Sequence, residues 1–337
     1  MIERANKSII FFPDTEPGIS RIRRGRGFSY LAADGTRIDD QQERKRLASM
    51  AVPPAYKNVW MCPFDEGHLR ATGRDDRGRK QYLYHPDWRR LREEKKFDHL
   101  ADVGAALPAM RRWIERHLGG EVGDRSTAIA AVMALIDRAS LPPGDPRNTR
   151  ENNSHGATTL RNDHIDFEGE TIFLDYRAKG GEHVQKSLRG SRLAHVLEAS
   201  RHLPGAELIS WTDEQGNARI VRTEEINEVL SSFSDTDFTA KSLRTWNGTH
   251  AAFMAAIEAK APTIADLSKA ASQRLHNNPA IARSSYIHPS AIEICTWKNR
   301  ALKDFRADID LAPKAPYREG EIALLAFLED KRCSRDI

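Results

Sequence analysis

The feature that most constrains the fold is a change of pattern near residue 97. Before it, apolar residues come in short runs bounded by Gly, Pro or Asp, as is typical of short strands, at residues 9–12, 28–31 and 59–61. After it, apolar residues recur at helical spacing, beginning with a helix that contains Leu107 and Leu118 and ends at Gly119. We therefore predict an α+β protein of two domains: a small β-rich domain over 1–97 and a larger, mostly α-helical domain over 98–337.

Within the larger domain, apolar spacing and capping residues predict further helices over 126–139, 224–232, 241–257, 263–275 and 319–328. One small antiparallel hairpin interrupts them: strands over 171–177 and 182–186 flank a turn at 178–181 that carries Lys179 at its tip. A further strand is predicted at 156–160, after a turn-rich loop at 141–150.

Composition narrows the class of protein. The chain has 337 residues and a net charge of +4, which is consistent with an anionic partner. No stretch approaches 18 apolar residues and no apolar run follows Met1, so we expect neither a membrane span nor a secretory signal. The cysteines at 62, 295 and 333 are far apart, which argues against a zinc site or a disulfide framework and favours the cytoplasm.

The basic segment at 79–85 is predicted to form a strand. Alternation places side chains on its two faces as follows: Gln81, Leu83 and His85 on one, and Lys80, Tyr82 and Tyr84 on the other. Amides and phenols on a strand can contact base edges and phosphates if the strand lies at a DNA groove. The alternative is a solvated charged face with tyrosines packed at its rim.

Tyr286 is the candidate nucleophile, in a segment at 282–289 with serines and an arginine beside it. A phenol has a pKa of about 10, so it attacks at neutral pH only where cations surround it and its target. Arg244, early in a predicted helix, and Lys179 are candidate cations, and Asn277 lies nine residues before the tyrosine. Taken one at a time, a tyrosine such as Tyr286 is more often a half-buried aromatic and an arginine such as Arg244 more often belongs to a surface ion pair. A turn lysine such as Lys179 is more often simply exposed.

Taken together and in this order, the segments resemble the short, poxvirus-like and bacterial type IB DNA topoisomerases. The resemblance rests on VPPAYKNVW (52–60), GHLRATGRD (67–75), GRKQYLYH (78–85), REN (150–152), GATTL (156–160), AKGG (178–181), KSLRTW (241–246) and RSSYIHP (283–289). The first three are specific to this family, whereas the later ones are shared in outline with tyrosine recombinases.

The resemblance implies that Tyr286 attacks a DNA phosphodiester, forms a 3′-phosphotyrosyl link and releases a 5′-hydroxyl that later reseals the strand. It implies that Arg244 and Asn277 contact the non-bridging oxygens, that Lys179 protonates the leaving 5′-oxygen, and that Gln81, Tyr82, Tyr84 and Lys80 contact DNA. No metal or nucleotide cofactor is expected. Residues 1–97 would be the DNA-clamp domain and 98–337 the catalytic domain of a monomer that binds double-stranded DNA and is associated with the nucleoid.

One position departs from the family pattern. The family carries another arginine nine residues before its Glu-Asn pair, and counting back from Glu151 gives Pro142. Because proline carries no side-chain donor, we expect reduced activity unless Arg147 or Arg138 replaces the missing cation. Three alternatives remain: a catalytically weakened DNA-binding homologue, a tyrosine recombinase, and a basic protein with no role on DNA.

Overall fold

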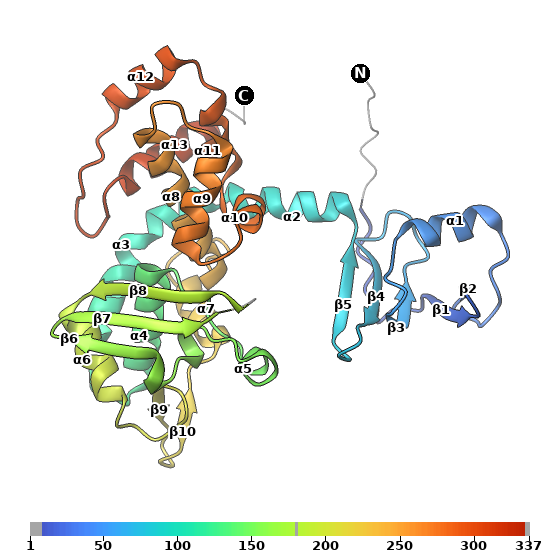
Figure 1. Ribbon diagram of the computed structural model, residues 1–337, viewed down its shortest axis with the longest axis horizontal. Helices are drawn as coiled ribbons and strands as arrows, with labels where there is room; N and C mark the ends of the chain where they lie inside the picture. Colours follow the sequence, from blue (N-terminus) through green and yellow to red (C-terminus); the bar gives the residue numbers. More distant parts are fainter. Residues whose placement is uncertain (1–8, 179–180, 334–337) are drawn as a thin grey trace. The chain divides into compact units, whose positions relative to one another are not determined.

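The computed structural model describes residues 9–178 and 181–333. Two compact units, Met1–Lys95 and Lys96–Ile337, make up the chain. The α+β fold is confirmed, because a unit built on a sheet is followed by a mostly helical one (Figure 1). The helix α2 (Pro86–Asp98) runs from the first unit into the second. Within the described residues, no helix is long and apolar enough to cross a lipid bilayer.

Unit 1 is an antiparallel five-stranded sheet in the order β2-β1-β3-β4-β5. The elements are β1 (Ile19–Arg24), β2 (Gly27–Leu31), α1 (Gln41–Ser49), β3 (Lys57–Met61), β4 (Leu69–Arg74) and β5 (Lys80–Tyr84). A small core forms where Leu47 of α1 packs with buried side chains of β1, β3 and β4. The strand predicted at 9–12 is wrong: Ile10 makes one isolated bridge to Gly67, and the N–H of Phe12 donates to His68 Nδ1 at 2.9 Å.

Unit 2 is organised around α4 (Arg125–Ala139), whose residues 127–137 are all buried. It packs against the helices α3 (Leu100–His117), α6 (Ser191–Ser200) and α8 (Ala240–Glu258) (Figure 1). It also contacts the strands β8 (His183–Arg189) and β9 (Ser210–Thr212). Helix α7 (Thr223–Ser231), α9 (Ile264–Leu275) and α13 (Glu321–Cys333) confirm the other predicted helices. The remaining helices of at least five residues are α5 (Pro146–Asn152), α10 (Pro279–Tyr286), α11 (Pro289–Glu293) and α12 (Asn299–Asp308).

The predicted hairpin is present in a three-stranded antiparallel sheet of β6 (Ile165–Glu168), β7 (Thr171–Arg177) and β8 (His183–Arg189). A second, two-stranded sheet pairs β9 (Ser210–Thr212) with β10 (Ala218–Ile220). In the hairpin, β7 and β8 pair along their full lengths, from Thr171 opposite Arg189 to Arg177 opposite His183. Alternate residues of β7 face the core, as expected for a sheet with one buried side.

The strand predicted at 156–160 is wrong, because residues Ala157–Thr159 form a turn of 3₁₀-helix. Their N–H groups pair with the preceding loop: Ala157 donates to Pro142 O at 2.8 Å and Thr158 donates to Pro143 O at 2.7 Å. A Cβ on Gly156 would lie 2.7 Å from Pro142 O, so this close approach requires glycine. The segment therefore fixes the loop at 141–145 instead of joining a sheet.

Candidate active site

Tyr286 is the last residue of α10. The side chain of Asn278 caps the start of this helix by accepting from the N–H of Ala280 at 2.8 Å. The helix ends because the chain becomes extended at Ile287, shortly before Pro289. Tyr286 is therefore held at a helix terminus with a half-buried side chain.

Helix α8 fixes the backbone of Tyr286 from the other side. The hydroxyl of Thr249 donates to the Tyr286 carbonyl at 3.2 Å and accepts from the N–H of His288 at 3.0 Å. A Cβ on Gly248 would lie 2.8 Å from the same carbonyl, so glycine is needed for α10 to approach α8 this closely. The position of the candidate nucleophile is thus set by packing between helices far apart in the sequence.

Arg244 lies beside Tyr286, with its Cζ 5.5 Å from the centre of the phenol ring. Its guanidinium is buried and donates to the carbonyl of Ser140 and, at 3.2 Å, to that of Leu275. Burial lowers the pKa of Arg244, and the neighbouring Tyr286 phenol opposes this shift. These two predicted site residues are therefore brought together, and Arg244 is held rigidly by the carboxyl ends of α4 and α9.

Lys186, on β8, binds the ends of α4 and α9 as Arg244 does. In each helix it contacts the residue before the one that Arg244 contacts. Its amine donates to the carbonyls of Ala139 at 2.9 Å and Arg274 at 3.5 Å, and lies 3.4 Å from His276 Nε2. No motif in the sequence had identified Lys186 as a site residue. The available signal was a lysine at an inward-facing position of the strand, at period-two spacing from buried apolar residues.

Asn277 follows directly after the end of α9, where His276 adopts a left-handed backbone with φ of 51°. Both polar atoms of the Asn277 carboxamide are shielded from solvent and have no hydrogen-bond partner among the described residues. An unsatisfied buried amide costs about 1–3 kcal/mol, so an incoming ligand oxygen would relieve it. A phosphate oxygen is one acceptor that the NH₂ group can bind.

Lys179 lies outside the described residues. The strands that flank it are described, and the N–H of Ala178 donates to Glu182 O at 2.8 Å across the hairpin end. Its predicted role as general acid stays a prediction.

Pro142 occupies the loop between α4 and α5, with its carbonyl used by Ala157. Of the two arginines proposed to replace the missing cation, Arg138 pairs with Glu115 of α3. Arg147 is exposed near the start of α5, where Asp145 caps its N–H at 2.8 Å. Replacement of the cation by Arg147 is therefore still a prediction.

The residues predicted to contact DNA in unit 1 lie on β5, on the two faces expected. Tyr82 and Tyr84 stack on one face, with ring centroids 6.2 Å apart, and Tyr82 is 46% exposed. The Lys80 ammonium lies 5.3 Å from the Tyr82 ring and 2.5 Å from Asp14 Oδ2. An exposed aromatic pair beside a cation can contact phosphate and sugar groups.

Gln81 faces the other way. Its amide donates to Asp75 Oδ2 at 2.9 Å, and the same carboxylate pairs with Arg79 at 2.8 Å. The side-chain hydrogen bond from Arg79, with smaller contributions from its backbone N–H and from Gln81, lowers the pKa of Asp75 to about 2 against the opposing effect of desolvation. This hydrogen bond fixes the orientation of the Gln81 carboxamide. It engages the NH₂ group and does not involve the amide oxygen.

Two family models match this chain. One, described as the N-terminal domain of bacterial DNA topoisomerase IB, matches residues 27–75. The other, described as the catalytic core of eukaryotic DNA topoisomerase I, matches residues 85–283, which is more than half of the 337 residues. The chain belongs to the type IB DNA topoisomerases. The family predicted from the motifs is confirmed, and with it the activity of a DNA topoisomerase, an isomerase acting on DNA.

A curated type IB relative is "DNA topoisomerase 1B" of Acanthamoeba polyphaga mimivirus. It is 25% identical over 293 residues, which are 82% of this chain and 87% of the relative. The match to the type IB catalytic core includes Arg244 and Asn277 but ends at residue 283, before Tyr286. The match therefore does not test the role of Tyr286, whose place beside Arg244 comes from the structure.

Proposed function

We propose that this topoisomerase relaxes supercoiled double-stranded DNA through a covalent bond between Tyr286 and a 3′-phosphate. The observation that supports this best is the pairing of a buried, fixed Arg244 with the Tyr286 phenol. Supercoiled plasmid incubated with the protein, without magnesium or ATP, should be relaxed in steps. A plasmid that stays supercoiled while still bound by the protein would contradict the proposal.

The proposed reaction exchanges one phosphoester bond for another. The Tyr286 hydroxyl gives its proton to solvent water and attacks phosphorus, a Tyr–O–P bond forms, the P–O5′ bond breaks, and the 5′-oxygen takes a proton from Lys179. Arg244 and the unsatisfied Asn277 amide donate to the non-bridging oxygens, where negative charge grows. The 5′-hydroxyl then attacks the phosphotyrosine and reverses every step, so the reaction as written consumes no nucleotide. One nucleophile suffices for one nick, so we infer a monomer acting on the nucleoid in the cytoplasm.

Lys179→Ala is expected to slow single-turnover cleavage of normal DNA by about 10²–10⁴-fold, the range for loss of a general acid. A substrate with sulfur at the bridging 5′ position has a better leaving group and should restore most of the rate. Lys269→Ala, which removes an exposed lysine of α9, serves as the matched control. Equal losses on the oxygen and sulfur substrates would assign Lys179 an electrostatic role instead.

A catalytically weakened homologue is the second candidate function, and Pro142 is the observation that favours it. Arginine at this position can still offer the backbone carbonyl that Ala157 uses, so Pro142→Arg is compatible with the loop. We expect Pro142→Arg to speed cleavage, by up to about 10²-fold if a transition-state cation is restored.

Arg147→Ala should slow cleavage more than it weakens DNA binding, as measured by single-turnover kinetics and a binding titration. No change in cleavage would remove Arg147 as the replacement cation. Absence of any covalent adduct in the parent protein, together with intact DNA binding, would favour the weakened homologue.

A further inference from the structure

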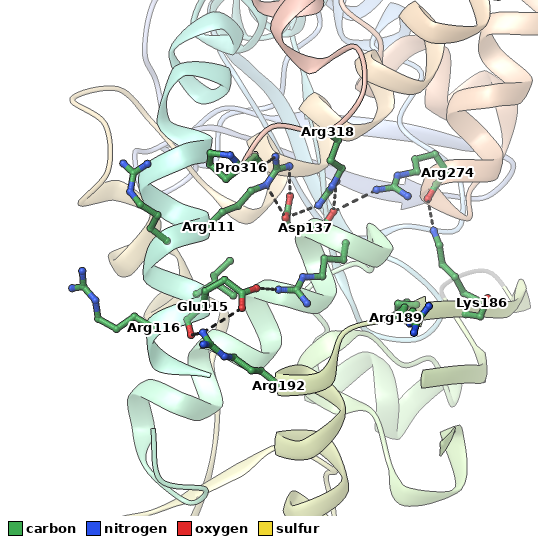
Figure 2. Close-up of a pocket in the computed structure, with 15 residues that line it drawn as sticks. Arg111, Glu115, Arg116, Asp137, Lys186, Arg189, Arg192, Arg274, Pro316 and Arg318 are labelled. Carbon is green, nitrogen blue, oxygen red and sulfur yellow. Dashed lines mark hydrogen bonds and ion pairs between the residues drawn. The ribbon is translucent and has the colours of Figure 1, made fainter. Parts of the chain in front are cut away.

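Unit 2 contains a strongly basic pocket of about 930 Å³, drawn in Figure 2. Nine basic side chains line it: Arg111, Arg112, Arg116, Arg138, Lys186, Arg189, Arg192, Arg274 and Arg318. Two acidic side chains, Glu115 and Asp137, also line it. The lining residues therefore carry a net charge of +7, whereas the whole chain has a net charge of +4.

The carboxylates are already engaged. Asp137 is buried and bonds Arg111 at 3.0 Å and Arg318 at 2.5 Å. Glu115 pairs with Arg138, and at 3.7 Å with Arg192. Each lining carboxylate thus faces two guanidinium groups. Two further carboxylates pair with lining arginines from outside the pocket, Glu321 with Arg111 at 2.5 Å and Glu170 with Arg189 at 3.5 Å, and an excess of five positive charges remains.

Lys186 and Arg274 lie side by side in the wall of the pocket (Figure 2). Lys186 donates to the carbonyls of Ala139 and Arg274, each one residue before a carbonyl that Arg244 binds. Burial, followed by Arg274, Arg244 and Arg318, lowers the pKa of Lys186 to about 7. Burial, followed by Lys186 and the same two arginines 244 and 274, lowers the pKa of His276 to about 4. Neighbouring cations thus disfavour the charged forms of both groups, and a bound anion would oppose this effect.

We propose that this pocket binds a compact polyphosphate, an anion of three or more charges that is either free or the tail of a nucleotide. Guanidinium groups suit this ligand because their N–H forks match phosphate oxygens. The cations come from separate helices, a strand and a loop around one volume of a size common for small-molecule sites. Ile114, Leu188 and Pro316 also line the pocket, so part of its lining is apolar.

The pocket borders the site of DNA cleavage through Lys186 and Arg274 and extends away from it along β8. Arg189 lies at the opposite end of β8 from the hairpin turn, a separation of about 20 Å over six residues of strand. Neither Tyr286 nor Asn277 lines it. The inference does not rest on the proposed function, because binding of a polyphosphate is measured without DNA.

The test is calorimetric titration of the full-length protein at 150 mM salt with inorganic triphosphate, ATP and orthophosphate. We expect saturable 1:1 binding of triphosphate, at least tenfold tighter than that of orthophosphate. Tighter binding of ATP than of triphosphate would identify a nucleotide, and equal binding a free polyphosphate. Triphosphate binding that is no tighter than orthophosphate binding would overturn the proposal.

Paired substitutions test whether triphosphate binds in this pocket. Arg189→Ala/Arg192→Ala removes two exposed arginines of the lining and should weaken triphosphate binding at least tenfold. Arg300→Ala/Lys303→Ala, which removes two exposed cations of α12, is the matched control and should change binding less than twofold. Equal losses in both pairs would mean non-specific attraction. Loss of single-stranded oligonucleotide binding, without triphosphate binding in the parent protein, would assign the pocket to DNA.

Lys186 supplies an independent readout. The charged and titratable groups around it are Arg244, Arg274, His276 and Arg318. A bound anion favours the protonated amine and raises the pKa of Lys186, so binding at pH 7.5 should take up protons, seen as a binding enthalpy that depends on the buffer. Lys186→Gln retains a donor for Ala139 O but should remove most of this proton uptake. Uptake that persists unchanged would contradict the placement of the ligand against Lys186.

Discussion

Tyr286→Phe is expected to bind DNA as the parent protein does and to form no covalent DNA adduct. The substitution removes one oxygen and keeps the ring and the backbone contacts of this residue: the Tyr286 carbonyl accepts from Thr249, and a Cβ on Gly248 would contact it. The fold should therefore be unchanged, while the atom that bonds to phosphorus is gone. The measurement is a denaturing gel of labelled DNA, on which the shifted protein–DNA band should vanish.

Tyr176→Phe is the matched control. Tyr176 is a buried tyrosine of β7 whose hydroxyl has no hydrogen-bond partner among the described residues, and burial raises its pKa. This variant should form the adduct at the parent rate. An adduct that persists in Tyr286→Phe but disappears in Tyr176→Phe would transfer the role of nucleophile to Tyr176.

Arg244→Ala is expected to slow single-turnover cleavage by at least about 10²–10³-fold, the range for loss of one transition-state donor. The side chain lies 5.5 Å from the Tyr286 ring centre and also donates to the carbonyls of Ser140 and Leu275. Two carbonyls would lose their donor, at a cost of about 1–3 kcal/mol of stability each if they remain dry. The melting temperature should therefore be measured beside the rate, at a temperature where the variant is folded.

Arg306→Ala separates the two effects. Arg306 also donates to two carbonyls near the end of a helix, those of Ala256 and Ala259. We expect it to lower the melting temperature in the same way and to leave the cleavage rate within about twofold of the parent. Comparable losses of rate in both variants would show that Arg244 acts on stability and not on the phosphate.

Secondary structure in unit 2 could be predicted from the sequence because its signals are local. The apolar spacing that gave α3 and α4 lies within each helix, and the box between Thr263 and Asp266 forms within one turn of α9, with N–H to side-chain bonds of 3.2 Å in both directions. The pairing of β7 with β8 follows from a short turn between two apolar runs. The family was also predictable, because long motifs carry it.

The prediction at 156–160 failed because a local pattern does not record a competing partner. The N–H groups of this segment bond to a proline-rich loop about fifteen residues earlier, so they are not available to a sheet.

The arrangement of the site depends on the tertiary structure. Arg244 meets Ser140 and Leu275, which are 104 and 31 residues away, at helix ends that packing alone brings together. Lys186 joins the same two ends from a third element, and nine basic side chains converge on one pocket from segments spread over more than 200 residues. The sequence by itself determined the helices, the hairpin and the identity of Tyr286 and Arg244 as candidates. Their geometry, the unsatisfied amide of Asn277 and the charge of the pocket were decided by long-range packing, because desolvation and Coulomb energies depend on which groups are neighbours in space.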